Sequence, residues 1–106
     1  MTRKIKVGII QQANTKDLRT NLMNLAKSIE ACAAHGAQLV VLQELHNSLY
    51  FCQTENTQLF ELAEPIPGPS TDALSPVAKE LGVVIIASLF EKRAQGLYHN
   101  TTAVID

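Results

Sequence analysis

The chain has 106 residues, of which 46% are hydrophobic, and nine Lys and Arg against ten Asp and Glu give a formal charge of -1 at pH 7. A chain of this length usually forms one domain. Because its charge is nearly balanced, it offers no basic field for nucleic acid or anionic lipid, and we expect neither as a partner. The longest apolar stretch, residues 81–90, is about half the ~20 residues that a membrane-spanning helix needs, so we expect a soluble protein.

The first residues of the chain and its cysteines indicate the cellular compartment of the protein. The first apolar run ends at Gln11-Gln12, which is too early for the core of a secretory signal peptide. Two cysteines, Cys32 and Cys52, are present. In a chain without a secretory signal they are expected to be reduced thiols, and we predict a cytoplasmic protein.

The first half of the sequence predicts a strand, a helix and a second strand. Residues 5–12 form a β-branched apolar run, and residues 14–17 have turn and helix-cap chemistry. From Leu18 onward, apolar residues recur at helical spacing, and Gly36 stands where a left-handed helix end is expected. The apolar helical positions are Leu22, Leu25, Ile29 and Ala33. Residues 37–42 run apolar without alternation, which predicts a strand covered on both faces.

The second half predicts a long connection, a second helix and two further strands. Residues 47–58 have no usable period, and residues 64–70 contain three of the four prolines, so we expect an ordered surface connection. A helix is then expected to begin with a capping residue at Ser70, Thr71 or Asp72. It should end at Gly82. Residues 83–90 and 98–105 are predicted strands of an antiparallel hairpin.

This order of elements, strand-helix-strand-helix-strand-strand, predicts the α/β class. Two right-handed crossovers would place the first three strands parallel in one sheet. No internal repeat or low-complexity segment interrupts residues 1–106, and we expect them to belong to one domain. The sequence stops at the end of an apolar strand with no closing helix, so we expect an unfinished sheet.

Glu44 is the strongest candidate for catalysis. It follows the apolar strand predicted over residues 39–42, and open α/β sheets place their ligand crevice at the carboxyl ends of strands. Partial desolvation there raises the pKa of a carboxyl group and makes it a better proton acceptor near neutral pH. A helix cap or a salt-bridge partner at a strand end remains the alternative role from position alone.

The residues around Glu44 resemble a known family. Residues 43–46 and 49–53, Gln-Glu-Leu-His and Leu-Tyr-Phe-Cys-Gln, resemble the first catalytic segment of the nitrilase superfamily of carbon-nitrogen hydrolases. Further segments resemble the same family in the same order: residues 6–12 its first strand, Asn21 its first helix, residues 63–69 the loop before its second helix, and residues 98–106 its fourth strand. The resemblance therefore extends over nearly the whole chain.

The resemblance implies the N-terminal portion of an αββα sandwich enzyme with a Glu-Lys-Cys triad. Glu44 would be the general base that activates the cysteine thiol, while lysine stabilises the tetrahedral intermediate. In the family both the lysine and the cysteine follow the fourth strand, so they would lie beyond Asp106, and the 106-residue chain alone is expected to be inactive. The resemblance also implies a small-molecule substrate, a homo-oligomer and no cofactor.

Residues 50–53 are similar to the N-carbamoylputrescine amidases of that superfamily, which implies hydrolysis of N-carbamoylputrescine to putrescine, carbon dioxide and ammonia. β-Ureidopropionase or another aliphatic amidase is the alternative within the superfamily. A non-catalytic binding or assembly module is the alternative of another class, because an exposed strand edge recruits partners. Tyr50 is a candidate substrate-binding residue, and packing with Phe51 is its alternative role.

The remaining polar residues carry weaker expectations. Cys32 is expected to be a small buried hydrophobe of the first helix, and Cys52 matches a loop position that the family does not use for catalysis. Asn100 matches a strand segment in which a structural hydrogen bond is expected. His35, His46 and His99 lack the spacing of metal ligands, and we predict no metal. Glu64, Glu80 and Glu91 are expected on the solvated surface, with a pocket or subunit contact as the alternative for Glu64.

Overall fold

The computed structural model describes residues 4–15, 17–43 and 63–106. Its elements in chain order are β1 (Val7–Ile10), α1 (Leu18–Ala34), β2 (Leu39–Leu42), α2 (Pro69–Leu81), β3 (Val84–Ala94) and β4 (Leu97–Ile105). The predicted order of elements is therefore confirmed. Glu44, His46, Tyr50 and Cys52 lie outside the described residues.

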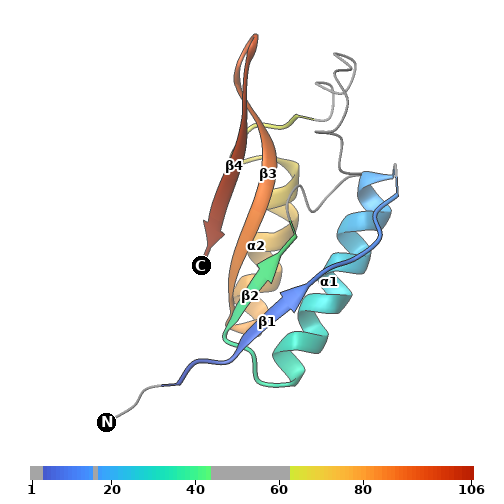
Figure 1. The fold of residues 1–106 in the computed structure, drawn as a ribbon, viewed down its shortest axis with the longest axis vertical. Helices are drawn as coiled ribbons and strands as arrows, with labels where there is room; N and C mark the ends of the chain where they lie inside the picture. Colours follow the sequence, from blue (N-terminus) through green and yellow to red (C-terminus); the bar gives the residue numbers. More distant parts are fainter. Residues whose placement is uncertain (1–3, 16, 44–62) are drawn as a thin grey trace.

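The four strands form one sheet in the order β1-β2-β3-β4. The first three strands are parallel, with Val40 paired to both Gly8 and Ile85, and β4 runs antiparallel to β3, with Ile105 opposite Ile85. The helices α1 and α2 contact each other and cover the same face of this sheet (Figure 1). The α/β class, the parallel strands and the terminal hairpin are all as predicted.

The helix α1 begins and ends as its sequence predicts. The Asp17 side chain accepts a hydrogen bond from the backbone N of Arg19 at 3.1 Å and another from the Thr20 hydroxyl at 2.8 Å, which caps the first turn. After the C-cap residue His35, Gly36 has a φ of +91°, a conformation that costs little without a side chain.

The sheet has one face packed against the helices and one open face. Strand residues that point toward the helices are buried: Ile10, Val40, Leu42, Ile85, Ala87, Leu89 and Ile105. On the opposite face, Ile9 is 79% exposed and Val104 66% exposed. The expectation that the second strand is covered on both faces is wrong for the described residues. Both described helices lie on one side, and Leu39 and Val41 are only half-buried.

The helix α2 begins earlier than predicted. Its N-cap is Gly68 and its first residue is Pro69, whereas the sequence predicts a cap at residue 70, 71 or 72. Proline suits the first helical position because its φ is already helical and it has no N–H to satisfy. Thr71 supports the cap from inside the helix: its hydroxyl accepts from Gly68 N at 2.7 Å and donates to Gly68 O at 3.0 Å. The helix ends at Gly82, with a φ of +67°, as predicted.

The strand β3 continues past the predicted residue 90 to Ala94, and an irregularity between Lys92 and Ala94 shifts its register with β4. The turn that follows contains Gly96, with a φ of +77°. In the part of the chain that the structure describes, neither helix combines the length and the apolar character that crossing a membrane requires.

Candidate functional site at the carboxyl ends of the parallel strands

Gln12 and Gln43 join the carboxyl ends of β1 and β2. The backbone pairing of these strands ends at Ile10 and Leu42. Beyond it, the side-chain Oε1 of Gln43 accepts a hydrogen bond from the backbone N of Gln12 at 2.5 Å. A side chain thus continues the connection where the backbone ladder stops, at the edge where open α/β sheets bind ligands. Gln43 directly precedes Glu44 in the sequence.

The Gln12 side chain extends this connection to the helix α1. Its Nε2 donates to the backbone O of Asn21 at 3.2 Å and to Oδ1 of Asn14 at 2.7 Å. Gln12 therefore contacts Gln43 through its backbone and α1 through its side chain. Both glutamines are half-buried, so these hydrogen bonds are partly protected from competition by water.

Asn21 holds the segment between β1 and α1. Only 1% of Asn21 is exposed. Its Oδ1 accepts from the backbone N of Thr15 at 2.8 Å and from the Thr15 hydroxyl at 3.1 Å, and its Nδ2 donates to Thr15 O at 2.8 Å. One buried amide therefore pairs both backbone groups of Thr15. We call Gln12, Asn14, Thr15, Asn21 and Gln43 the strand-end network.

The open face of the sheet contains a hollow of about 390 Å³. Its polar lining comes from Ser88, Asn100 and Thr102 on β3 and β4, and Val41 and Ile86 contribute apolar surface. The Ser88 hydroxyl lies 3.4 Å from Asn100 Oδ1, to which it donates. This contact joins β3 to β4, whereas the structural role of Asn100 near the glutamate loop stays a prediction, because that loop lies outside the described residues.

Glu64 follows Glu44 in the sequence and lies just before α2. It is only 5% exposed. Its Oε1 accepts from Ser70 N at 2.8 Å and its Oε2 from the Ser70 hydroxyl at 3.0 Å. The expectation of a solvated carboxylate is wrong here. The free N–H groups and the positive end of α2 attract the carboxylate into the first turn of the helix.

The backbone of Glu64 is fixed as well. Its N–H donates to Phe90 O at 2.9 Å, and its O accepts from Lys92 N at 2.8 Å, so Glu64 forms a short parallel bridge with β3. Side chain and backbone together join the start of α2 to the end of the sheet. The sequence signal for this role was an acidic residue a few positions before a Pro-Gly-Pro helix start, which we interpreted as surface chemistry.

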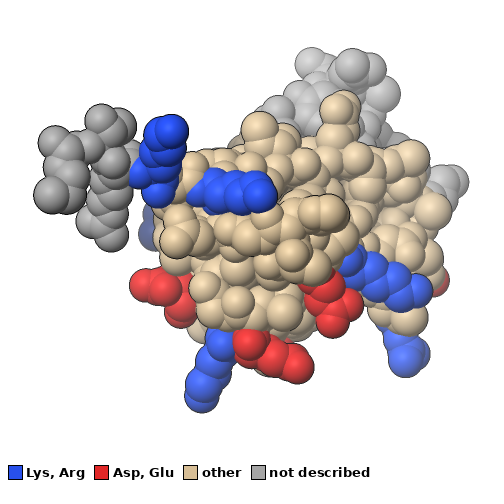
Figure 2. Space-filling model, turned by 90° about the horizontal axis from the view of Figure 1, so that it is seen from below, with Lys and Arg blue, Asp and Glu red and all other residues tan. Residues whose placement is uncertain are grey.

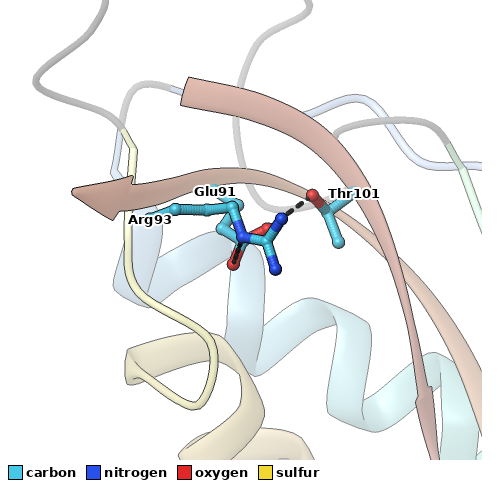
Figure 3. Close-up of polar contacts among 3 residues, drawn as sticks. All are labelled: Glu91, Arg93 and Thr101. Atoms are coloured by element: carbon cyan, nitrogen blue, oxygen red, sulfur yellow. Dashed lines mark hydrogen bonds and ion pairs between the residues drawn. The ribbon is translucent and has the colours of Figure 1, made fainter. Parts of the chain in front are cut away.

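Glu91 also departs from its expected exposure, whereas Glu80 is exposed as predicted. The Glu91 side chain is 13% exposed and accepts from the Thr101 hydroxyl at 2.8 Å. Arg93 Nε lies 3.6 Å from Glu91 Oε2, and Figure 3 shows the three side chains together on the terminal hairpin. Glu91 and Thr101 therefore connect β3 to β4 on the face that packs toward the helices.

Cys32 is a half-buried free thiol that packs against β1. A Cβ atom at Gly8 would lie 2.8 Å from the Cys32 sulfur, so the strand passes close to the helix at this point. The packing role is as predicted, but Cys32 is half-buried and not buried as expected. Among residues 4–15, 17–43 and 63–106, no three His, Cys, Asp or Glu side chains are close enough together to hold a metal ion.

Figure 2 shows charges of both signs on one face of the molecule, with Lys and Arg interspersed among Asp and Glu and no extended patch of one sign. The predicted roles of Glu44 and Tyr50 stay predictions, because both residues lie outside the described part of the chain. What the structure adds is the hydrogen bonding of the strand-end network, which the sequence does not predict. Polar Gln12 after an apolar strand and Gln43 before Glu44 were the available signals.

Comparison with known sequences finds relatives over almost all of this chain. It is 38% identical over 105 residues to an N-carbamoylputrescine amidase of Solanum lycopersicum. The matched region covers 98% of the chain and 35% of the relative. It is also 38% identical over 102 residues to an omega-amidase of Xenopus laevis, with 95% and 35% covered. The chain thus spans about a third of the length of the relatives it matches.

Solved structures agree with the fold. A carbon-nitrogen hydrolase from Helicobacter pylori G27 matches with a TM-score of 0.86 and 39% identity, over 94% of this chain and 35% of that one. A nitrilase-superfamily protein of Saccharomyces cerevisiae matches with a TM-score of 0.78 and 25% identity, over 96% and 40%. The family model described as carbon-nitrogen hydrolase matches residues 6–106. The chain belongs to the carbon-nitrogen hydrolase family of the nitrilase superfamily.

Proposed function

We propose that the protein containing this chain is an amidohydrolase that cleaves a non-peptide C–N bond, with Glu44 as general base. The observation that carries the proposal is the Gln12–Gln43 hydrogen bond, which fixes the residue before Glu44 at the carboxyl ends of two parallel strands. Family membership and the relatives named as amidases support the reaction class. Residues 1–106 would then form part of a single hydrolase domain.

The proposed chemistry uses a triad of which this chain supplies one member. Glu44 accepts the proton of a cysteine thiol, and the thiolate attacks the carbamoyl or amide carbon. A lysine stabilises the negative charge on the tetrahedral intermediate. The proton passes from Glu44 to the leaving nitrogen, and water that gives its proton to Glu44 then hydrolyses the acyl-enzyme. The lysine and the cysteine are expected beyond Asp106, so we propose that the 106-residue chain alone is inactive.

For the substrate we propose N-carbamoylputrescine, with putrescine, carbon dioxide and ammonia as products. Support comes from the resemblance of residues 50–53 to N-carbamoylputrescine amidases and from the relative of that name. Tyr50 is the proposed substrate-binding residue. Because an omega-amidase is equally similar in identity, an aliphatic amidase is the second candidate, and β-ureidopropionase is a third.

Two measurements test these assignments on the purified, sequence-verified protein that contains this chain. Ammonia release is compared between N-carbamoylputrescine, an omega-amide and N-carbamoyl-β-alanine, and clear preference for either carboxylate-bearing substrate would reject the putrescine assignment. Glu44→Gln is expected to lower kcat/KM by about 10²–10⁴-fold, as loss of a general base does. Wild-type turnover by Glu44→Gln would reject Glu44 as the base.

A non-catalytic module is the alternative of another class. The exposed apolar side chains of Ile9 and Val104 on the open face of the sheet favour it, since such a surface can bind another chain. Turnover by the purified protein excludes it, whereas stable binding of a partner without turnover supports it. We also propose that the enzyme is cytoplasmic and that it is a homo-oligomer. Measurement of the native mass tests the oligomeric state.

A further inference from the structure

We propose that Gln43 and Gln12 are positioning residues for Glu44, an inference that rests on the proposed function. The covalent and hydrogen-bonded path is short. Gln43 precedes Glu44 in the chain, and its Oε1 accepts from the backbone N of Gln12, so the contact restrains the strand end from which Glu44 departs. A general base must lie within hydrogen-bond reach of the proton it accepts, so movement of this strand end would reduce proton transfer.

The hydrogen bond to Gln12 can restrain Gln43 only if Gln12 is itself held in place. Its Nε2 bonds to Asn21 O and to Asn14 Oδ1, and the buried Asn21 amide pairs with Thr15. Asn21 lies in the first turn of α1, whose next buried residue, Leu25, packs in the core. Gln43 is therefore tied through Gln12 to a helix that is itself fixed by core packing, which is the support that a precisely held catalytic group requires.

The position of the Gln43 contact in the sheet supports the same conclusion. The backbone ladder between β1 and β2 ends at Ile10 and Leu42, one residue before Gln43. A backbone bond there would hold the main chain of both strands parallel. The side-chain bond instead restrains Gln43 one residue beyond the last backbone pair. Gln43 is therefore restrained at the point from which the chain continues to Glu44.

The decisive variant is Gln43→Met, which keeps the length of the side chain but removes the acceptor oxygen. We expect kcat to fall about 10–100-fold with little change in KM, because a displacement of about 1 Å at a catalytic group has an effect of this order. Gln12→Met removes the side-chain bonds but keeps the backbone donor, so it should lower kcat in the same way by a smaller factor.

The matched control is Gln38→Met. Gln38 lies just before the opposite end of β2 and is exposed, so the same substitution there should leave kcat and KM unchanged. Thermal unfolding of each variant shows whether a loss of rate follows a loss of folded protein. If Gln43→Met does not fold, Gln12→Met carries the test alone, and an unchanged kcat in that variant overturns the proposal.

A double-mutant cycle separates positioning from general stability. In a Glu44→Gln background the base is already absent, so Gln43→Met should add little further loss of rate. The same fold loss in both backgrounds would overturn the positioning role. The two proposals fail differently. Wild-type activity of Glu44→Gln rejects the proposed function, whereas an inactive Glu44→Gln with a fully active Gln43→Met rejects only the positioning role.

Discussion

The Glu64 carboxylate accepts two hydrogen bonds from Ser70. Oε1 accepts from the Ser70 backbone N at 2.8 Å, and Oε2 accepts from the Ser70 hydroxyl at 3.0 Å. The contact satisfies a free N–H of the first turn of α2 and places negative charge at the positive end of the helix. Because Glu64 is buried, water does not compete freely for these bonds. Glu64 therefore stabilises the junction between the proline-rich segment and the sheet.

Substitution of Glu64 should lower stability. We expect Glu64→Ala to reduce the free energy of unfolding by about 2–4 kcal/mol, because Ser70 loses two hydrogen bonds to a charged acceptor in a buried place. Glu64→Gln keeps one acceptor oxygen and should cost less. Urea unfolding of the purified protein measures both, with Glu80→Ala, at an exposed position of α2, as the control. A loss in Glu80→Ala as large as that in Glu64→Ala would contradict the specific role of the contact.

Asn21 should be equally sensitive. Asn21→Leu keeps the approximate volume of the side chain but leaves both backbone groups of Thr15 without their partner, and we expect a cost of about 2–4 kcal/mol in the free energy of unfolding. Asn24→Leu, on the exposed side of α1, is the control and should cost less than about 0.5 kcal/mol. Equal effects of the two substitutions on the urea midpoint would show that the Thr15 contacts contribute nothing.

Sequence periodicity was sufficient for the elements of this fold. Apolar spacing at Leu22, Leu25 and Ile29 predicted α1, and glycine at positions 36 and 82 predicted where both helices end. These signals are local, because each depends on backbone preferences or on one buried face. The start of α2 was placed too late, since Ser70 and Thr71 are themselves good capping residues and Gly68 has no side chain to reveal its role.

The polar contacts at the candidate site were not predictable in the same way. Gln12 and Gln43 are 31 residues apart, and Glu64 and Ser70 meet only after a turn through three prolines. Glutamine and glutamate side chains are usually exposed, so the residue types alone predict positions on the surface. Only the parallel pairing of β1 and β2 brings Gln12 beside Gln43, the residue that precedes Glu44 in the sequence.

Gly8 is required by the close packing of β1 on α1. A Cβ atom at this position would lie 2.8 Å from Sγ and 2.9 Å from Cβ of Cys32. We expect Gly8→Ala to lower the free energy of unfolding by about 1–3 kcal/mol, as overpacking of a core does. Adding Cys32→Ala removes the sulfur but keeps the Cβ, so the double variant should recover only part of the loss. Strictly additive effects in urea unfolding would contradict direct contact between the two residues.

The N-cap of α1 should make stability depend on pH in the acid range. The hydrogen bond from the Thr20 side chain, followed by backbone hydrogen bonds and the charge of Arg19, lowers the pKa of Asp17 below its ordinary value of 3.8. A group whose pKa is lower in the folded state stabilises that state when ionised. The contribution is therefore present above pH 3.8 and is lost as the pH falls through the lower folded-state pKa.

Asp17→Asn tests this dependence because asparagine keeps a capping oxygen but cannot ionise. We expect the wild-type protein to have the higher Tm at pH 5–7, since its charged cap interacts favourably with the helix N-terminus, and the difference to shrink as the pH falls below 3.8. Asp72→Asn, in the first turn of α2, is the comparison and should leave the pH dependence that Asp17 causes intact. A Tm difference between wild type and Asp17→Asn that is constant from pH 2 to pH 7 would show that the Asp17 charge does not stabilise the fold.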